Sequence, residues 1–91
     1  MPSYHASARF SITAEKNEMR SASLGNDLKV HRARKNLTQE ELADLVGVTR
    51  PTINFIENGR FVPSALLALK IARIFEVPFE EVFFLEKGEA P

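Results

Sequence analysis

The 91-residue sequence contains no cysteine and no long apolar run. The absence of cysteine excludes a disulfide framework, a thiolate metal site and a thiol nucleophile, and it suits a reducing cytoplasm. The densest apolar run, Ala65 to Leu69, ends at Lys70. We therefore expect neither a signal peptide nor a membrane span, and we expect a cytoplasmic protein.

Residues that carry catalysis are also scarce. The two histidines, His5 and His31, lie in segments of different character, and no Ser/His/Asp set or pair of carboxylates stands out. Without cysteines or clustered histidines the sequence indicates no metal site, and nothing in it indicates a cofactor. The sequence therefore argues against an enzyme.

The chain has no net charge at pH 7, although proteins that bind nucleic acids usually carry a basic surface. The charges are unevenly distributed. Residues 28–60 contain six Lys or Arg against four Asp or Glu, whereas residues 61–91 contain three against five. Because binding depends on the field at one face, the neutral total does not exclude a nucleic-acid partner.

Residues 1–26 differ in composition from the rest of the chain. They are rich in Ser, Ala and Asn and contain only scattered large apolar residues. They predict an N-terminal extension, either a flexible tail or a short strand over Arg9–Thr13 that pairs with the C-terminus or with a second subunit. Met19 is an alternative start of the native protein. Residues 86–91 are predicted to form a C-terminal tail.

Residues 27–85 carry the start and stop signals of five short helices, over 28–35, 39–46, 50–57, 64–75 and 79–84. Asp27 and Thr49 are predicted caps, Thr38 with Glu41 forms a capping box, and Asn36 tolerates the left-handed conformation at a helix end. Apolar spacing places an inward face on these helices. Its residues are Leu42, Leu45, Val46, Val48, Ile53, Ile56, Leu67, Ala68, Ile71, Ala72, Phe75, Val82 and Phe83. The pattern predicts one all-α domain.

The most informative unit is helix 39–46, the turn at Gly47 and helix 50–57. Two short helices joined by a tight turn containing glycine form a helix-turn-helix, whose second helix can enter a DNA major groove. The run "LTQEELADLVGVTRPTINFIENGRFVPS" resembles the XRE family of small helix-turn-helix regulators, relatives of the phage repressor and Cro proteins. The resemblance covers about residues 27–85 and implies a five-helix lambda-repressor-like fold that binds double-stranded DNA.

The resemblance also implies which residues contact DNA. They are Gln39, Thr49, Arg50, Pro51, Thr52, Asn54, Phe55, Asn58 and Arg60. Residues at the start of helix 50–57 meet base edges, and residues 58–60 contact backbone phosphate. The planar fork of Arg50 can bind guanine O6 and N7 together. Gln39 is placed against a phosphate or in the groove, and Arg32 with Glu57 is implied to be a structural ion pair.

Two positions depart from the family pattern. Related sequences often carry Gln at the position of Pro51, where its amide can bind adenine, whereas proline has no side-chain donor but suits a first helical turn. We expect a reading helix that lacks this hydrogen bond at one base and has room for a methyl contact. His31 stands where the family usually has a large aliphatic residue, and we expect it to be neutral and half-buried.

Some apolar residues lie off the inward faces, namely Leu66, Leu69, Phe84 and Leu85. Exposed apolar patches tend to mark interfaces, and members of the family commonly dimerise through this region. The sequence therefore predicts a homodimer on a palindromic operator, acting as a small transcriptional regulator and repressor. The alternative is an antitoxin-type protein that binds a partner protein, uses residues 1–26 to wrap it, and autoregulates its own promoter.

Overall fold

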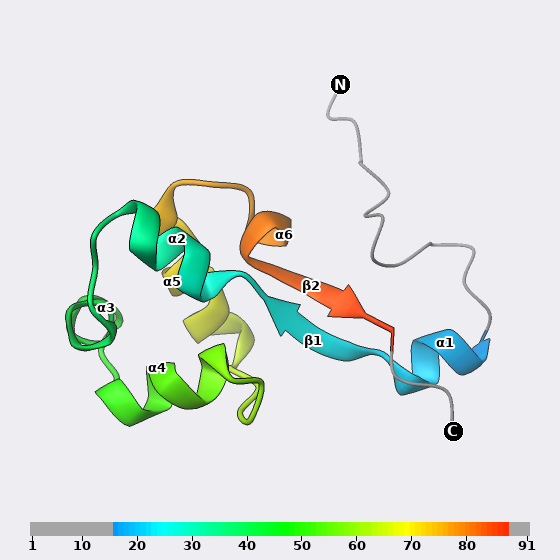
Figure 1. Ribbon diagram of the computed structural model, residues 1–91. Coiled ribbons are helices and arrows are strands. Elements are labelled where there is room, and N and C mark those ends of the chain that lie inside the picture. Colours follow the sequence, from blue (N-terminus) through cyan, green and yellow to red (C-terminus); the bar gives the residue numbers. More distant parts are fainter. Residues whose placement is uncertain (1–15, 88–91) are drawn as a thin grey trace.

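The computed structural model describes residues 16–87, which form six helices and a two-stranded antiparallel sheet (Figure 1). The elements are α1 Lys16–Ser21, β1 Ser23–Asn26, α2 Leu28–Arg34, α3 Gln39–Val46, α4 Arg50–Glu57, α5 Ala65–Phe75, α6 Phe79–Val82 and β2 Phe83–Glu86. Helices α2 to α6 confirm the five predicted helices. The predicted strand over residues 9–13 lies outside the described residues.

Local signals fix several helix ends. The capping box of α3 is present: the Glu41 N–H donates to the Thr38 hydroxyl at 3.0 Å, and the Thr38 N–H donates to the Glu41 carboxylate at 2.8 Å. Asn36, just after α2, has a positive φ of 55°, as predicted. The prediction for Asp27 is wrong in part, because this residue occupies the N-cap position without a side-chain cap bond.

Twelve residues from α2 to β2 form the apolar core. They are Leu28, Leu42, Ala43, Val46, Ile53, Ile56, Ala68, Ile71, Ala72, Phe75, Val82 and Phe83. Leu45 was predicted to point inward and is 58% exposed instead. Successive helical residues are about 100° apart, so a face centred on Leu42, Ala43 and Val46 leaves Leu45 on the flank. The small Ala43 takes the inward place where α3 packs against α4 and α5.

The sheet corrects the predicted end of α6. That helix stops at Val82, and Phe83–Glu86 pairs with β1 so that Asn26 lies opposite Phe83 and Ser23 opposite Glu86. Aromatic residues suit a strand, and β1 supplies the backbone partners. Phe84 is only 8% exposed, so the prediction that it is a surplus exposed residue is wrong, whereas Leu66, Leu69 and Leu85 are exposed.

The sheet also combines residues of all three predicted segments: β1 belongs to the extension 1–26, Phe83 to Leu85 belong to the helix-turn-helix region 27–85, and Glu86 belongs to the C-terminal tail. It extends away from the helical part, with α1 at its far end (Figure 1). Strand pairing thus brings the end of the predicted extension against the end of the helix-turn-helix region. The division of the chain into three segments stays a prediction.

His31 is more deeply buried than predicted. It is 6% exposed, and its ring stacks on Phe75 with 5.5 Å between the centroids. The ring Nε2 lies 3.1 Å from the Glu81 carbonyl oxygen, which accepts a hydrogen bond from the tautomer protonated there. The Nε2 atom of this buried ring therefore has a backbone partner within the protein.

Candidate nucleic-acid interface

A left-handed glycine makes the turn between α3 and α4. Gly47 has a φ of 81°, and the N–H groups of Gly47 and Val48 both donate to the Ala43 carbonyl, at 2.9 and 3.0 Å. A residue with a Cβ is strained in this conformation, so the turn favours glycine. The turn leaves Arg50 and Pro51, the first residues of α4, exposed.

An ion pair between α2 and the end of α4 lies behind the turn. Arg32 Nε is 2.7 Å from Glu57 Oε2 and Nη2 is 3.3 Å from Oε1, and the two side chains are 16% and 4% exposed. Arg32 Nη1 also donates to the Leu37 carbonyl at 2.7 Å. The structure therefore confirms the implied pair and gives the buried carboxylate the partners it needs.

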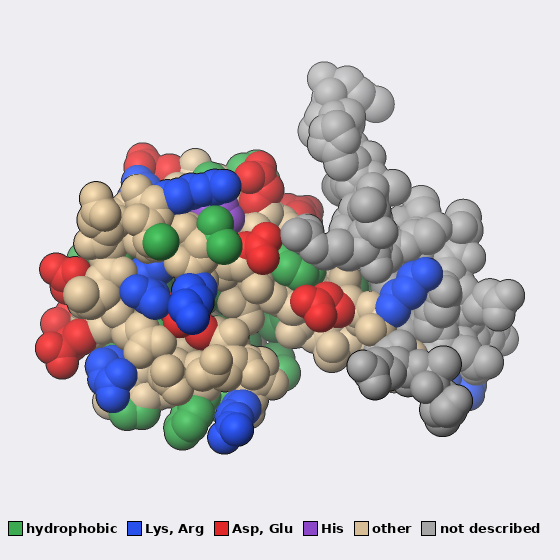
Figure 2. All heavy atoms as spheres, viewed as in Figure 1, with side chains coloured by type: hydrophobic (Ala, Val, Ile, Leu, Met, Phe, Trp, Pro, Cys, Tyr) green, Lys and Arg blue, Asp and Glu red, His purple; other side chains and the backbone are tan. Residues whose placement is uncertain are grey.

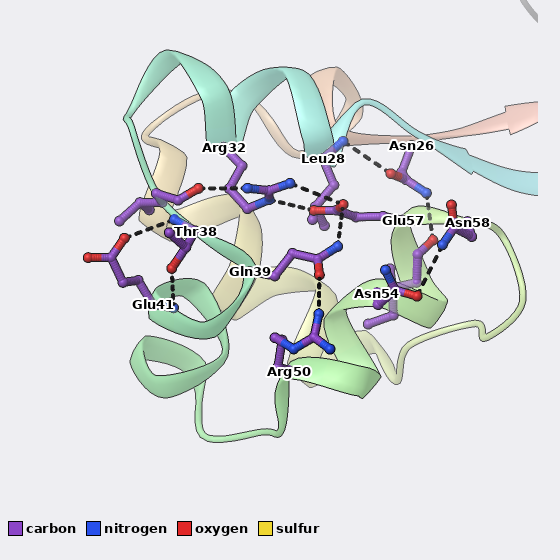
Figure 3. Close-up of polar contacts among 12 residues, drawn as sticks. Asn26, Leu28, Arg32, Thr38, Gln39, Glu41, Arg50, Asn54, Glu57 and Asn58 are labelled. Atoms are coloured by element: carbon purple, nitrogen blue, oxygen red, sulfur yellow. Dashed lines mark hydrogen bonds and ion pairs between the residues drawn. The ribbon is translucent and has the colours of Figure 1, made fainter.

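Gln39, the first residue of α3, connects this pair to the exposed Arg50 (Figure 3). Its Nε2 donates to Glu57 Oε1 at 2.9 Å, and its Oε1 accepts from Arg50 Nη1 at 3.1 Å. Only the amide nitrogen can donate to a carboxylate, so Glu57 fixes the orientation of the amide. A guanidinium has five N–H donors, so Arg50 keeps others for a partner outside the protein.

The remaining polar candidates lie along α4 and the turn that follows it. The hydroxyls of Thr49 and Thr52 are 3.0 Å apart, and Asn58 Nδ2 donates to Asn54 Oδ1 at 3.2 Å. The prediction for Thr49 is wrong in part, because this residue occupies the N-cap position of α4 without a side-chain cap bond. The hydroxyl pair lies at the start of α4, and the amide pair lies at its C-terminal end.

The apolar candidates are on the same helix. Pro51 and Phe55 are one turn apart, and Phe55 is 47% exposed. Proline costs little in the first turn, where backbone N–H groups have no partner inside the helix. The N–H of the exposed Arg60 donates to the Phe55 carbonyl at 2.8 Å, so the turn after α4 folds against the helix end.

Charge is arranged differently on α3 and α4. In Figure 2, basic and hydrophobic side chains lie along the edge formed by α4, and acidic side chains gather beside α3. The exposed acids of α3 are Glu40, Glu41 and Asp44. Hydrogen bonds from the backbone N–H and then the side chain of Thr38 hold the pKa of Glu41 below its usual value. The edge formed by α4 therefore suits an anionic partner better than the outer face of α3 does.

The structure thus gathers all nine predicted DNA-contacting positions on the start of α3, on α4 and around its two ends. It engages both ends of the Gln39 amide within the protein, a contact that sequence spacing does not reveal. Sequence reasoning also missed Phe61 and Val62, which are exposed directly after Arg60, and Asn26, which joins β1 to α4.

Other kinds of site find no support in the described part of the chain. Among residues 16–87, no group of three or more His, Asp or Glu is placed to hold a metal ion. Over the same residues, the helices are too short or too polar for one to cross a membrane.

Residues 28–82 match the model of a protein family described as helix-turn-helix, and the chain belongs to this family. Its members are DNA-binding transcriptional regulators and not enzymes. The resemblance to XRE-type regulators and the lambda-repressor-like fold are therefore confirmed.

Several relatives are similar over most of their length. An HTH-type transcriptional regulator of Methanocaldococcus jannaschii is 52% identical over 64 residues, which cover 70% of this chain and 97% of that protein. The HTH-type transcriptional regulator YgzD of Bacillus subtilis is 52% identical over 62 residues, which cover 68% and 94%. Among solved structures, the restriction-modification controller protein C.AhdI from Aeromonas hydrophila is similar, with a TM-score of 0.56 and 33% identity over 59% of this chain and 82% of that one.

Proposed function

We propose that this protein binds a specific double-stranded DNA site with α4 in the major groove and represses transcription by occupying a promoter in the cytoplasm. One observation carries the proposal. The hydrogen-bonded series Glu57–Gln39–Arg50 holds a guanidinium at the exposed start of α4. Since this family consists of DNA-binding regulators, an oriented arginine at that point is well placed to read a base.

In this proposal the residues along α4 contact bases, and the candidates around its two ends contact phosphates. Arg50 bonds to guanine O6 and N7, a contact worth about 1–3 kcal/mol of discrimination between bases. Pro51 and Phe55 form an apolar strip suited to a thymine methyl, and Thr52 and Asn54 supply hydrogen bonds. The remaining candidates, Gln39, Thr49, Asn58 and Arg60, lie at the two ends of α4, where phosphates of the groove wall pass.

The functional unit in this proposal is a homodimer on a palindromic operator. Leu66 and Leu69 are exposed on α5 and Leu85 is exposed on β2, and a second copy would cover them. Phe84 also belongs to the predicted interface, although one chain already buries it. The two copies of α4 then lie about 34 Å apart, one turn of DNA.

Selection of bound duplexes from a random DNA library tests the proposal, with the wild type and Arg50→Ala compared at a fixed salt concentration of ~150 mM. An enriched palindrome that the variant no longer selects supports regulator, dimer and reading helix together. If Arg50→Ala selects the same motif as the wild type, Arg50 does not read a base and the reading surface lies elsewhere on the protein. No enrichment for the wild type favours the antitoxin-type alternative, in which this domain is a scaffold for a partner protein.

A further inference from the structure

A single side chain joins three elements behind the reading helix. Asn26, the last residue of β1, donates from Nδ2 to the Ile56 carbonyl at 2.9 Å, near the end of α4. Its Oδ1 accepts from the Leu28 N–H at 3.1 Å, at the start of α2 (Figure 3). One amide therefore bonds to the C-terminal end of α4 and to the N-terminal end of α2.

Both of these bonds go to groups that have no partner within their own helix. Leu28 is the first residue of α2, where N–H groups have no partner within the helix, and Asp27 makes no side-chain cap bond there. Ile56 belongs to the last turn of α4, and its carbonyl also accepts from the Gly59 N–H at 3.0 Å. Asn26 thus fixes the end of α4 opposite to the exposed Arg50.

The backbone of Asn26 is itself firmly placed. Asn26 lies opposite Phe83 in the sheet, and the next residue, Asp27, donates its N–H to the Val82 carbonyl at 2.9 Å. Phe83 and Val82 are 1% and 0% exposed. The amide therefore joins α4 to a part of the core that does not belong to the helix-turn-helix unit.

We propose that Asn26 is a positioning residue that sets the tilt of α4 for base reading. The inference rests on the proposed function. Arg50 lies six residues before Ile56, about 9 Å along the helix axis, so a tilt of about 6° at Ile56 moves Arg50 by about 1 Å. Bonds to base edges tolerate little displacement, whereas phosphate contacts through flexible side chains adapt. Loss of the bond therefore lowers specific binding and spares non-specific binding.

The test is Asn26→Asp, which keeps an acceptor for the Leu28 N–H and replaces the donor to Ile56 by a carboxylate oxygen. Asn36→Asp is the matched control, because it makes the same change of charge at an exposed residue outside the interface. Affinities for the selected duplex and for a scrambled duplex are measured at one salt concentration. Hydrogen exchange of the Gly59 amide, which donates to Ile56, reports on the end of α4.

Compared with the control, we expect Asn26→Asp to lose about 10-fold in specific affinity, with unchanged affinity for the scrambled duplex and faster Gly59 exchange. Parallel loss on both duplexes, or Gly59 exchange equal to that of the control, overturns the inference. If the wild type selects no duplex, the proposed function fails. Gly59 exchange then decides separately whether Asn26 holds α4.

Discussion

The ion pair between Arg32 and Glu57 allows the sharpest energetic prediction. Arg32→Ala removes two of the three hydrogen bonds to the Glu57 carboxylate and leaves the one from Gln39. Breaking a buried pair costs about 3–5 kcal/mol, because an uncompensated charge stays buried. Since Glu57 is 4% exposed and keeps one donor, we expect a loss near the lower limit, about 3 kcal/mol.

Urea unfolding at neutral pH measures this loss. With an m-value of about 1–3 kcal/mol per molar urea, the midpoint falls by about 1–3 M. Lys35→Ala is the control, because it breaks an exposed ion pair with Glu76 and should leave the midpoint almost unchanged. Exposed ion pairs contribute less than about 1 kcal/mol. A loss this small for Arg32→Ala would refute the argument that burial of Glu57 makes the pair important for stability.

A double variant separates stability from function. Arg32→Met with Glu57→Met removes both charges and fills the space with apolar groups, so we expect most of the lost stability to return. Specific DNA binding should be lost in the double variant, because Gln39 no longer has the carboxylate that orients its amide toward Arg50. Recovery of stability together with specific binding contradicts the role given to Gln39.

Three further predictions concern the core, the reading helix and acid stability. Leu42→Ala should lower the free energy of unfolding by about 2–5 kcal/mol, whereas Leu45→Ala, on the exposed flank of α3, should change it by less than about 0.5 kcal/mol in the same urea assay. Pro51→Gln should add adenine to the motif that library selection recovers, and an identical motif would mean that residue 51 faces no base. The hydrogen bond from Lys35 and its charge lower the pKa of Glu76, so this pair stabilises the fold above the usual pKa of a Glu carboxyl, and the benefit disappears as the pH falls through the lowered pKa. As the pH falls from the usual pKa of a Glu carboxyl to the lowered pKa of Glu76, the free energy of unfolding should therefore decrease less in Lys35→Ala than in the wild type. If this free energy falls equally steeply with pH in both proteins, the ion pair does not contribute to acid stability.

Sequence alone determined the features that depend on neighbouring residues. The capping box of α3 needs only Thr38 and Glu41, three residues apart. The turn at Gly47 needs one residue that accepts a positive φ. Helical spacing then fixed which faces of α4 and α5 are apolar, so the helix-turn-helix and its family could be read from local pattern.

Tertiary structure decided the features that depend on contacts between distant segments. Phe83–Glu86 is a strand and not the end of α6, because β1, about 60 residues earlier, supplies its backbone partners. Leu45 is exposed because packing of α3 against α4 and α5 selects Ala43 for the inward face. The amides of Gln39 and Asn26 find partners 18 and 30 residues away. Hydrogen-bonding capacity is a property of each residue, but the choice of partner is made only when the chain has folded.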